Sequence, residues 1–223
     1  MLNNRALADA PSARTLVIWL AHPQKNQMTS SVSIQLGVAK NHIDGATELY
    51  CQALQEKITP FLGPPERAAP FLASGLVADR AFVALAAGEV VGIAGFKLAG
   101  RDLFRPSLGS FFREYGLSAP LRLGALALLE RKEEPDCLLM DGLAVAKSAR
   151  GQGIGTRLLA SIEAYAISLG KRSIRLDVID TNPAARRLYE RLGFVAQKTE
   201  NVGPLRVVLP FRQVTEMRKY LGP

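Results

Sequence analysis

The chain has 223 residues, of which 48% are hydrophobic and 22% are charged, a composition typical of a globular protein with a sizeable core. Its cysteines, Cys51 and Cys137, and its two histidines show neither zinc-ligand spacing nor a disulfide framework, so we expect no metal and a reducing, cytoplasmic location. The formal net charge of +8 favours an anionic partner, which could be a phosphorylated cofactor, a nucleic acid or a membrane surface.

The first thirty residues show no sign of a membrane segment. The longest apolar stretch there, 16–21, is far shorter than the ~20 residues that span a bilayer. The segment Met28-Thr29-Ser30-Ser31 is typical of a protein start. We therefore treat residues 1–29 as an N-terminal extension that need not belong to the fold, and 30–223 as one domain.

The next part of the chain alternates between strand and helix patterns. Apolar residues at every second position predict a half-buried strand at 32–38, and helical spacing predicts a helix from 44 to a stop at Thr59-Pro60. A Pro-rich connector precedes a short helix near 66–75. Two apolar runs, 81–85 and 90–96, flank Ala87-Gly88-Glu89 and predict a β-hairpin.

The segment 97–136 differs from its surroundings because it is rich in Leu, Phe and Arg. Its length is too great for a structureless loop in a compact domain, so we predict a helical insert with helices at 107–115 and 120–131. Strands are predicted at 137–145, 174–179, 194–199 and 207–217. The mixed order indicates an α/β or α+β fold.

A glycine-rich turn follows the predicted strand that ends at Val145. Arg150-Gly151-Gln152-Gly153-Ile154-Gly155 leads directly into an amphipathic helix that stops at Gly170. Free N–H groups and the helix dipole at such a turn favour phosphate oxygens. The dinucleotide fingerprint fails because Thr156 stands at its third glycine position, and the P-loop lysine is missing. Glycines for a tight turn and close packing are the alternative explanation.

A second motif follows about thirty residues later. Asn182-Pro183 has the residues of a helix start, and Leu188-Tyr189-Glu190 is followed by Gly193-Phe194. The two motifs at this spacing resemble those of the GNAT superfamily of N-acetyltransferases. The resemblance implies a central, mixed, mostly antiparallel sheet flanked by helices, with the helical insert between two central strands. It also implies that the sheet splays between the strand ending at Val145 and the strand 174–179.

The resemblance implies acetyl-coenzyme A (acetyl-CoA) as co-substrate, with residues on both motifs binding it. Strand residues would run beside the pantetheine arm, and the turn would cradle the pyrophosphate. Asn182 would lie near the arm or serve as helix N-cap, and Arg186 would meet the 3′-phosphate or lie on a solvated face. The implied cofactor-binding residues are Leu143, Ala144, Val145, Arg150, Gly151, Gln152, Gly153, Ile154, Gly155, Thr156, Asn182 and Arg186.

The resemblance also implies direct attack of an amine on the thioester, with no acyl-enzyme. Tyr189 matches the family's general acid, whose proton would pass to the departing thiolate. Its alternative role is that of a core tyrosine. Asp141 and Asp177 are the candidates for the base that deprotonates the amine, although Arg172 and Arg175 make an ion pair the simpler role for Asp177. The Val145 N–H would polarise the carbonyl.

We therefore expect an N-acetyltransferase that acts on a primary amine of a small molecule or peptide. Two alternatives stay open: a catalytically silent acetyl-CoA-binding module, and a nucleic-acid-binding protein suggested by the charge. The aromatic residues are not interleaved with basic runs, which disfavours nucleic acid. The insert would shape the amine site or form a homodimer contact.

Overall fold

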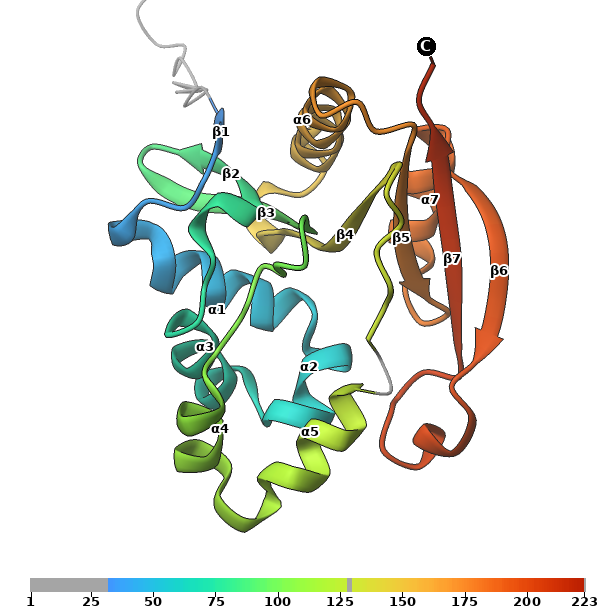
Figure 1. The fold of residues 1–223 in the computed structure, drawn as a ribbon. Helices are drawn as coiled ribbons and strands as arrows, with labels where there is room; N and C mark the ends of the chain where they lie inside the picture. Colours follow the sequence, from blue (N-terminus) through green and yellow to red (C-terminus); the bar gives the residue numbers. More distant parts are fainter. Residues whose placement is uncertain (1–31, 128–129, 223) are drawn as a thin grey trace, which may run out of the picture. The chain divides into compact units, whose positions relative to one another are not determined.

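The computed structural model describes residues 32–127 and 130–222. These residues form a seven-stranded sheet with the order β1-β2-β3-β4-β5-β7-β6 (Figure 1). All neighbouring strands are antiparallel except β4 and β5, which are parallel. The predicted mixed, mostly antiparallel sheet is thus confirmed. The strands are β1 Ser33–Leu36, β2 Ala81–Ala86, β3 Glu89–Lys97, β4 Cys137–Val145, β5 Ser173–Ile179, β6 Val195–Asn201 and β7 Gln213–Tyr220.

Helices cover both faces of the central strands. On one face α1 packs against β3 and β4, and a Cβ added at Gly142 would lie 2.7 Å from atoms of Tyr50 and Leu54. On the other face α6 packs so closely that a Cβ at Gly92 would lie 3.0 Å from Ile154. The helices are α1 Ile43–Ala53, α2 Gln55–Leu62, α3 Pro65–Ala73, α4 Leu108–Tyr115, α5 Ala119–Ala127, α6 Ile154–Ser168 and α7 Pro183–Arg191.

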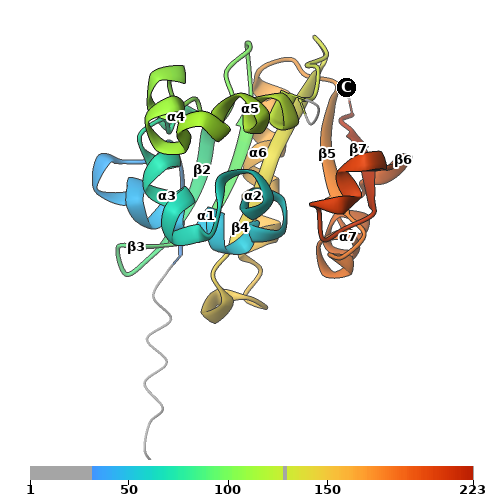
Figure 2. The same cartoon turned by 90° about the horizontal axis from the view of Figure 1, so that it is seen from below.

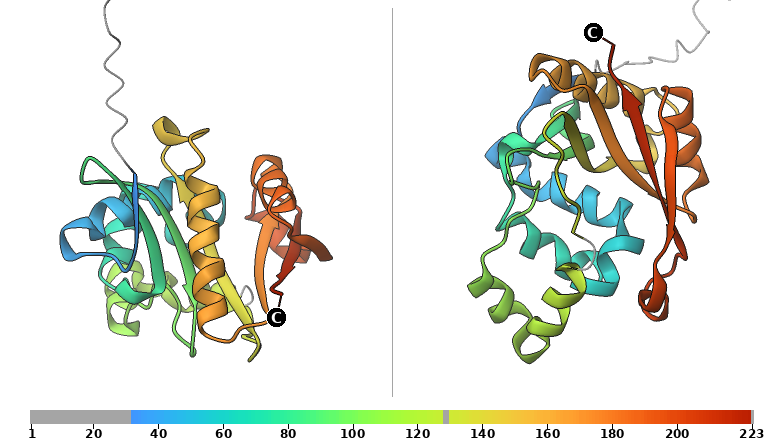
Figure 3. Two further views of the ribbon diagram at one scale, coloured as in Figure 1. Left: turned by 90° about the horizontal axis from the view of Figure 1, so that it is seen from above. Right: turned by 45° about the vertical axis from the view of Figure 1, so that its right-hand side comes forward.

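The sheet opens in its middle. β4 and β5 pair only over Cys137–Leu139 and Ser173–Arg175, although both strands continue well beyond these residues. Figures 2 and 3 show β5, β7, β6 and α7 leaning away from the half of the sheet that contains β1 to β4. This is the predicted splay. β4 also bulges at Asp141, because Gly95 opposes Gly142 while Phe96 opposes Met140.

Two sequence predictions outside the insert need correction. The helix expected from 44 to 60 divides at Leu54 into α1 and α2, and Pro60 lies inside α2, which ends before Gly63 at a φ of 88°. The strand expected at 207–217 was wrong in its first half. Residues Gly203–Val207 form a 3₁₀ helix that carries the chain around the end of the sheet, and β7 starts at Gln213.

The insert contains two helices, as predicted, and they pack on α2 and α3 rather than standing free. Tyr115 on α4 donates its hydroxyl hydrogen bond to the Leu62 carbonyl at 2.9 Å. The second predicted helix, 120–131, ends at Ala127 in the described residues; 128–129 lie outside them, and Arg131 is not helical. The predicted extension 1–29 also lies outside. None of the described helices is long and apolar enough to span a membrane.

Candidate active site

The glycine-rich turn precedes α6 on the side where the sheet opens. Gly151 and Gly153 have φ values of 78° and 74°, a conformation that other residues adopt with strain. A Cβ at either position would meet nothing within 4 Å, so the space beside the turn is open. Gly155 differs, since a Cβ there would lie 3.2 Å from Leu188 on α7. The first two glycines thus serve backbone conformation, and the third allows close packing.

A cavity of about 460 Å³ lies between this turn, the end of β4 and the start of α7. The structure brings ten of the twelve predicted cofactor-binding residues to its lining: Leu143, Ala144, Val145, Arg150, Gly151, Gly153, Ile154, Gly155, Thr156 and Asn182. The two others lie elsewhere. Gln152 donates to the Ser148 carbonyl at 3.3 Å, and Arg186 pairs with Glu190 at 2.9 Å along the exposed side of α7. Arg191, which sequence reasoning did not select, lines the cavity instead.

Asn182 can serve in both of the roles that the sequence left open, as a helix N-cap and as a residue near the cofactor arm. Its Oδ1 accepts a hydrogen bond from the Ala185 N–H at 3.0 Å, so it is the N-cap of α7. The same residue lines the cavity. Because the cap uses the carbonyl oxygen, the side-chain NH₂ donors stay available for a ligand.

Tyr189 lies on α7 with its ring buried against Phe194, and it lines the same cavity. Among the described residues its hydroxyl has no hydrogen-bond partner. Burial raises the pKa of Tyr189 to about 12, so the phenol keeps its proton at neutral pH. The side chain thus packs as a core tyrosine and lines the cavity, and its hydroxyl has no partner among the described residues.

A smaller cavity, of about 260 Å³, continues from this point along the opening between β4 and β5. It shares Tyr189, Asn182 and Leu143 with the first cavity. It shares Lys57 of α2 and Asp177 of β5 with a third cavity of about 550 Å³. The three cavities therefore form a series from the glycine-rich turn to the side where the insert lies.

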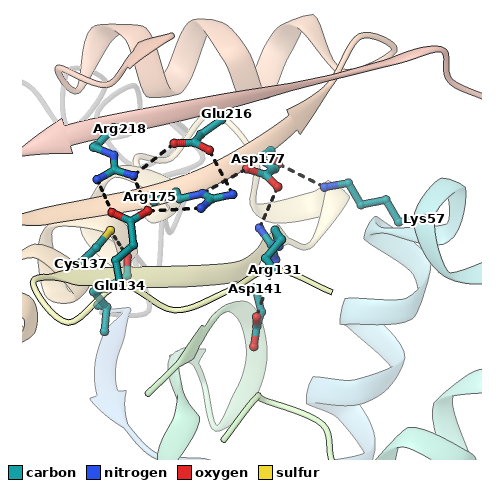
Figure 4. A network of polar contacts seen from close by, with 10 residues as sticks. Lys57, Arg131, Glu134, Cys137, Asp141, Arg175, Asp177, Glu216 and Arg218 are labelled. Carbon is teal, nitrogen blue, oxygen red and sulfur yellow. Dashed lines mark hydrogen bonds and ion pairs between the residues drawn. The ribbon is translucent and has the colours of Figure 1, made fainter. Parts of the chain in front are cut away.

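The third cavity contains both predicted base candidates (Figure 4). Arg131, from the end of the insert, lies between them, with Nη1 3.2 Å from Asp177 and Nη2 3.8 Å from Asp141. Asp141 also accepts a hydrogen bond from the Leu103 N–H at 2.9 Å. Burial raises the pKa of the Asp141 carboxyl, while this hydrogen bond and Arg131 oppose the rise.

Asp177 belongs to a wider network of ion pairs. Arg175 Nε lies 4.0 Å from Asp177, and Arg175 also contacts Glu216 at 3.0 Å and Glu134 at 3.4 Å. Arg218 on β7 holds Glu134 through two hydrogen bonds of 2.7 and 2.8 Å. Figure 4 shows how this network joins β5, β7 and the segment before β4. The ion pair that the sequence suggested for Asp177 is present, with Arg131 as its nearest partner.

Sequence reasoning missed Lys57 and Arg131. Lys57 belongs to an ordinary amphipathic helix pattern, and Arg131 is one of several basic residues in the insert. Both reach the site only because α2 and the end of the insert fold over the opened edge of β5. The sequence held no local signal for either residue.

Comparisons with known proteins agree with this geometry. The family model described as acetyltransferase (GNAT) family matches residues 48–194. A crystal structure titled as an acetyltransferase has a TM-score of 0.55 at 21% identity, covering 85% of this chain and 100% of the other. The ribosomal-protein-S18-alanine N-acetyltransferase from Escherichia coli has a TM-score of 0.54 at 16% identity, with coverages of 86% and 95%. The structure of yncA from Salmonella typhimurium with its cofactor acetyl-CoA has a TM-score of 0.55 at 19% identity, covering 86% of this chain and 94% of the other.

At these identities the solved structures establish the fold alone. A comparison with curated proteins gives no match to this sequence. The family match carries the assignment because it spans more than half of the chain, including both motifs and the opened sheet between them. The chain belongs to the GNAT acetyltransferase family and is an acyltransferase.

Proposed function

We propose that this chain transfers the acetyl group of acetyl-CoA to a primary amine of a small molecule or peptide. The series of three cavities along the opened sheet carries this proposal. It connects a turn suited to binding phosphate with a charged site at the other end of the opening. Similar structures that contain acetyl-CoA, such as yncA, support the choice of donor.

The donor fits the first cavity by its chemistry. The turn at Gly151 and Gly153 has open space beside its backbone, and the N-terminus of α6 favours the negative pyrophosphate. Beyond Leu139 the strand β4 has no pairing with β5, so its backbone groups on that side are available to an arm that carries amides. Leu143, Ala144 and Val145 line this path. The Val145 N–H stays our predicted group for polarising the thioester carbonyl.

Tyr189 is the proposed proton donor to the sulfur. Burial raises the pKa of this phenol to about 12, which would make it a weak acid toward a thiolate in water. A thiolate in the same opening is also withdrawn from water, and burial raises the pKa of a thiol as it raises that of a phenol. Burial therefore shifts the pKa values of both groups in the same direction, which keeps Tyr189 a suitable proton donor.

The third cavity is the proposed acceptor site. Asp141 and Asp177 provide negative charge that attracts an ammonium group, and Arg131 occupies the position between them. Asp177 lines the cavity that contains Tyr189, whereas Asp141 does not. Of the two predicted base candidates, Asp177 is thus closer to the site of attack. The identity of the amine stays open.

The test is a panel of amines that covers amino acids, polyamines, aminoglycosides, peptide N-termini and lysyl peptides, with detection of the released thiol. We expect at least one class to give acetylated product and coenzyme A in equal amounts. Tyr189→Phe should lower kcat by roughly 10²–10⁴ under conditions where chemistry limits turnover.

The control for this variant is Tyr165→Phe, which removes a hydroxyl from another ring of the same core. It should leave kcat unchanged, and neither variant should alter the affinity for acetyl-CoA. Release of thiol with none of the amines, despite tight binding of acetyl-CoA, would support a binding module instead. A Tyr189→Phe variant with full activity would remove Tyr189 as the acid.

A further inference from the structure

Among the described residues, Lys57 on α2 is the one lysine that lines two cavities of this series. Its half-buried side chain extends from the helix toward β5, where Nζ donates a hydrogen bond to the Asp177 carbonyl at 3.2 Å (Figure 4). The same small cavity contains Tyr189. An amine and a phenol thus line one cavity.

The carbonyl that Lys57 binds belongs to the opened side of β5. Backbone groups of successive strand residues point alternately to the two neighbouring strands. The Asp180 N–H donates to the Gln213 carbonyl on the β7 side, so the groups of Asp177, three residues earlier, point toward β4. Pairing with β4 has ended at Arg175 by then. Lys57 Nζ therefore lies in the opening between the two strands.

Among the described residues, no carboxylate forms an ion pair with Lys57. Arg131 contacts both Asp141 and Asp177, and each of these carboxylates therefore has a cation beside it. Among residues 32–127 and 130–222, no carboxylate oxygen lies within 4.0 Å of Lys57 Nζ. The ionisable groups that line the same small cavity beside Lys57 are Asp177 of β5, Glu56 of α2, Arg150 of the turn and Tyr189 of α7.

We propose that Lys57 is the general base that removes a proton from the acceptor ammonium, a role that rests on the acetyl transfer proposed above. Its position supports this because the acceptor must pass between the third cavity and the thioester, and Lys57 lines that passage. Burial, with Arg131 as a second cause, lowers the pKa of Lys57 to about 8, while Asp177 opposes the change. A lysine of this pKa is partly neutral near physiological pH, as a base requires.

The proton balance of the step is complete with these two side chains. The acceptor ammonium gives one proton to Lys57 Nζ, and the free amine then forms a C–N bond to the thioester carbonyl carbon. As the C–S bond breaks, the sulfur takes the proton of the Tyr189 hydroxyl. The phenolate recovers a proton from the new amide nitrogen, and Lys57 returns its own to water. One proton is released for each acetyl group transferred.

The experiment compares Lys57→Gln, Lys57→Arg and the control Lys171→Gln in the full chain. Lys171 also donates to a backbone carbonyl, that of Pro135 at 2.6 Å, so the control loses an equivalent bond outside the site. The kcat/KM for the acceptor is measured from pH 6 to 10 at saturating acetyl-CoA. Two acceptors from the amine panel are used whose amino groups differ in pKa, so that ionisation of the acceptor is separated from that of the enzyme.

For the wild type we expect kcat/KM to rise with pH through a pKa near 8 that is the same for both acceptors. Both Lys57 variants should lose about 10²–10³ in rate together with this rise. Lys57→Arg shows whether the site needs a positive charge or a group that accepts a proton. Its guanidinium keeps the charge but stays protonated, so it cannot act as a base. Lys171→Gln should match the wild type, and all variants should keep the affinity for acetyl-CoA within about threefold.

The proposal is overturned if Lys57→Arg retains the activity and pH dependence of the wild type. It is also overturned if Asp177→Asn removes the rise near pH 8 while the Lys57 variants keep it, since the carboxylate is then the base. In both cases the wild type still transfers acetyl groups, so the proposed function is retained. If the wild type acetylates no amine, the proposed function itself fails, which separates the two failures.

Discussion

The two ends of the opening between β4 and β5 are built in different ways. At the end near α6, the cavity is lined by the glycine-rich turn, with Gly151 and Gly153 in left-handed conformations and free N–H groups at a helix start. At the end near the insert, charged side chains from α2, β4, β5 and the end of the insert meet in one cavity. The proposed donor end thus depends on conformation, and the proposed acceptor end depends on charge.

This difference bears on what each end recognises. Every member of a family that uses the same donor needs the same phosphate cradle, and a backbone cradle is insensitive to most side-chain changes. The acceptor differs between relatives, and side chains such as Lys57 and Arg131 can change without altering the sheet. Substitutions at the two ends should therefore separate cleanly into effects on donor affinity and effects on the acceptor.

The largest separation is expected from Gly153→Glu at the donor end. A side chain at a φ of 74° is strained, and a carboxylate at the start of α6 repels the pyrophosphate. We expect affinity for acetyl-CoA to fall by at least about 10², measured by calorimetry. The control is Gly170→Glu, which has a φ of 69° and open space at the other end of α6. Equal affinity in both variants would contradict the cradle.

Arg131→Met should act at the acceptor end alone, with a smaller effect. It removes the cation shared by Asp141 and Asp177, which leaves the cavity more negative and raises the pKa of Asp141 further. For a polyamine acceptor we expect KM to fall by about fivefold to tenfold, with the donor affinity unchanged. Arg122→Met, which changes an arginine stacked on Tyr115 elsewhere in the insert, is the control. A rise in KM would show that Arg131 itself binds the acceptor.

The same contrast explains how much the sequence could predict. The donor end lies within two short motifs, from Arg150 to Thr156 and from Asn182 to Phe194, whose glycine, cap and helix signals are local. Ten predicted residues reached the cavity for that reason. Gln152 and Arg186 do not line the cavity because their side chains have partners elsewhere on the protein surface, and their predicted contacts with the cofactor stay predictions.

The acceptor end depends on contacts between residues far apart in sequence. Lys57 and Asp177 are 120 positions apart, and Arg131 reaches Asp177 only because the insert folds on α2 and α3. No periodicity or spacing encodes such contacts. Leu54, where the expected 44–60 helix divides, packs against Gly142 on β4, which is another contact between residues far apart in sequence.

The smallest expected effect concerns stability and comes from Lys57→Met. In the folded protein the pKa of Lys57 falls from 10.5 to about 8, so between these values the folded state binds fewer protons than the unfolded state. Wild-type stability should therefore rise as the pH increases from about 8 to 10.5 and should be lowest, with respect to this group, below pH 8. A change of this size corresponds to about 3 kcal/mol of unfavourable burial at neutral pH.

Methionine occupies a similar volume without the charge, but it also loses the hydrogen bond to Asp177, which is worth about 1 kcal/mol. We therefore expect Lys57→Met to raise the free energy of unfolding by about 2 kcal/mol at pH 7, with the gain lost as the pH rises toward 10.5. Urea unfolding at the two pH values measures this, with Lys171→Met as the control. A variant that is less stable than the wild type at pH 7 would show that Lys57 is an ordinary structural lysine. A variant that is more stable and inactive would show that the chain retains a destabilising amine because the acceptor end needs a neutral base there.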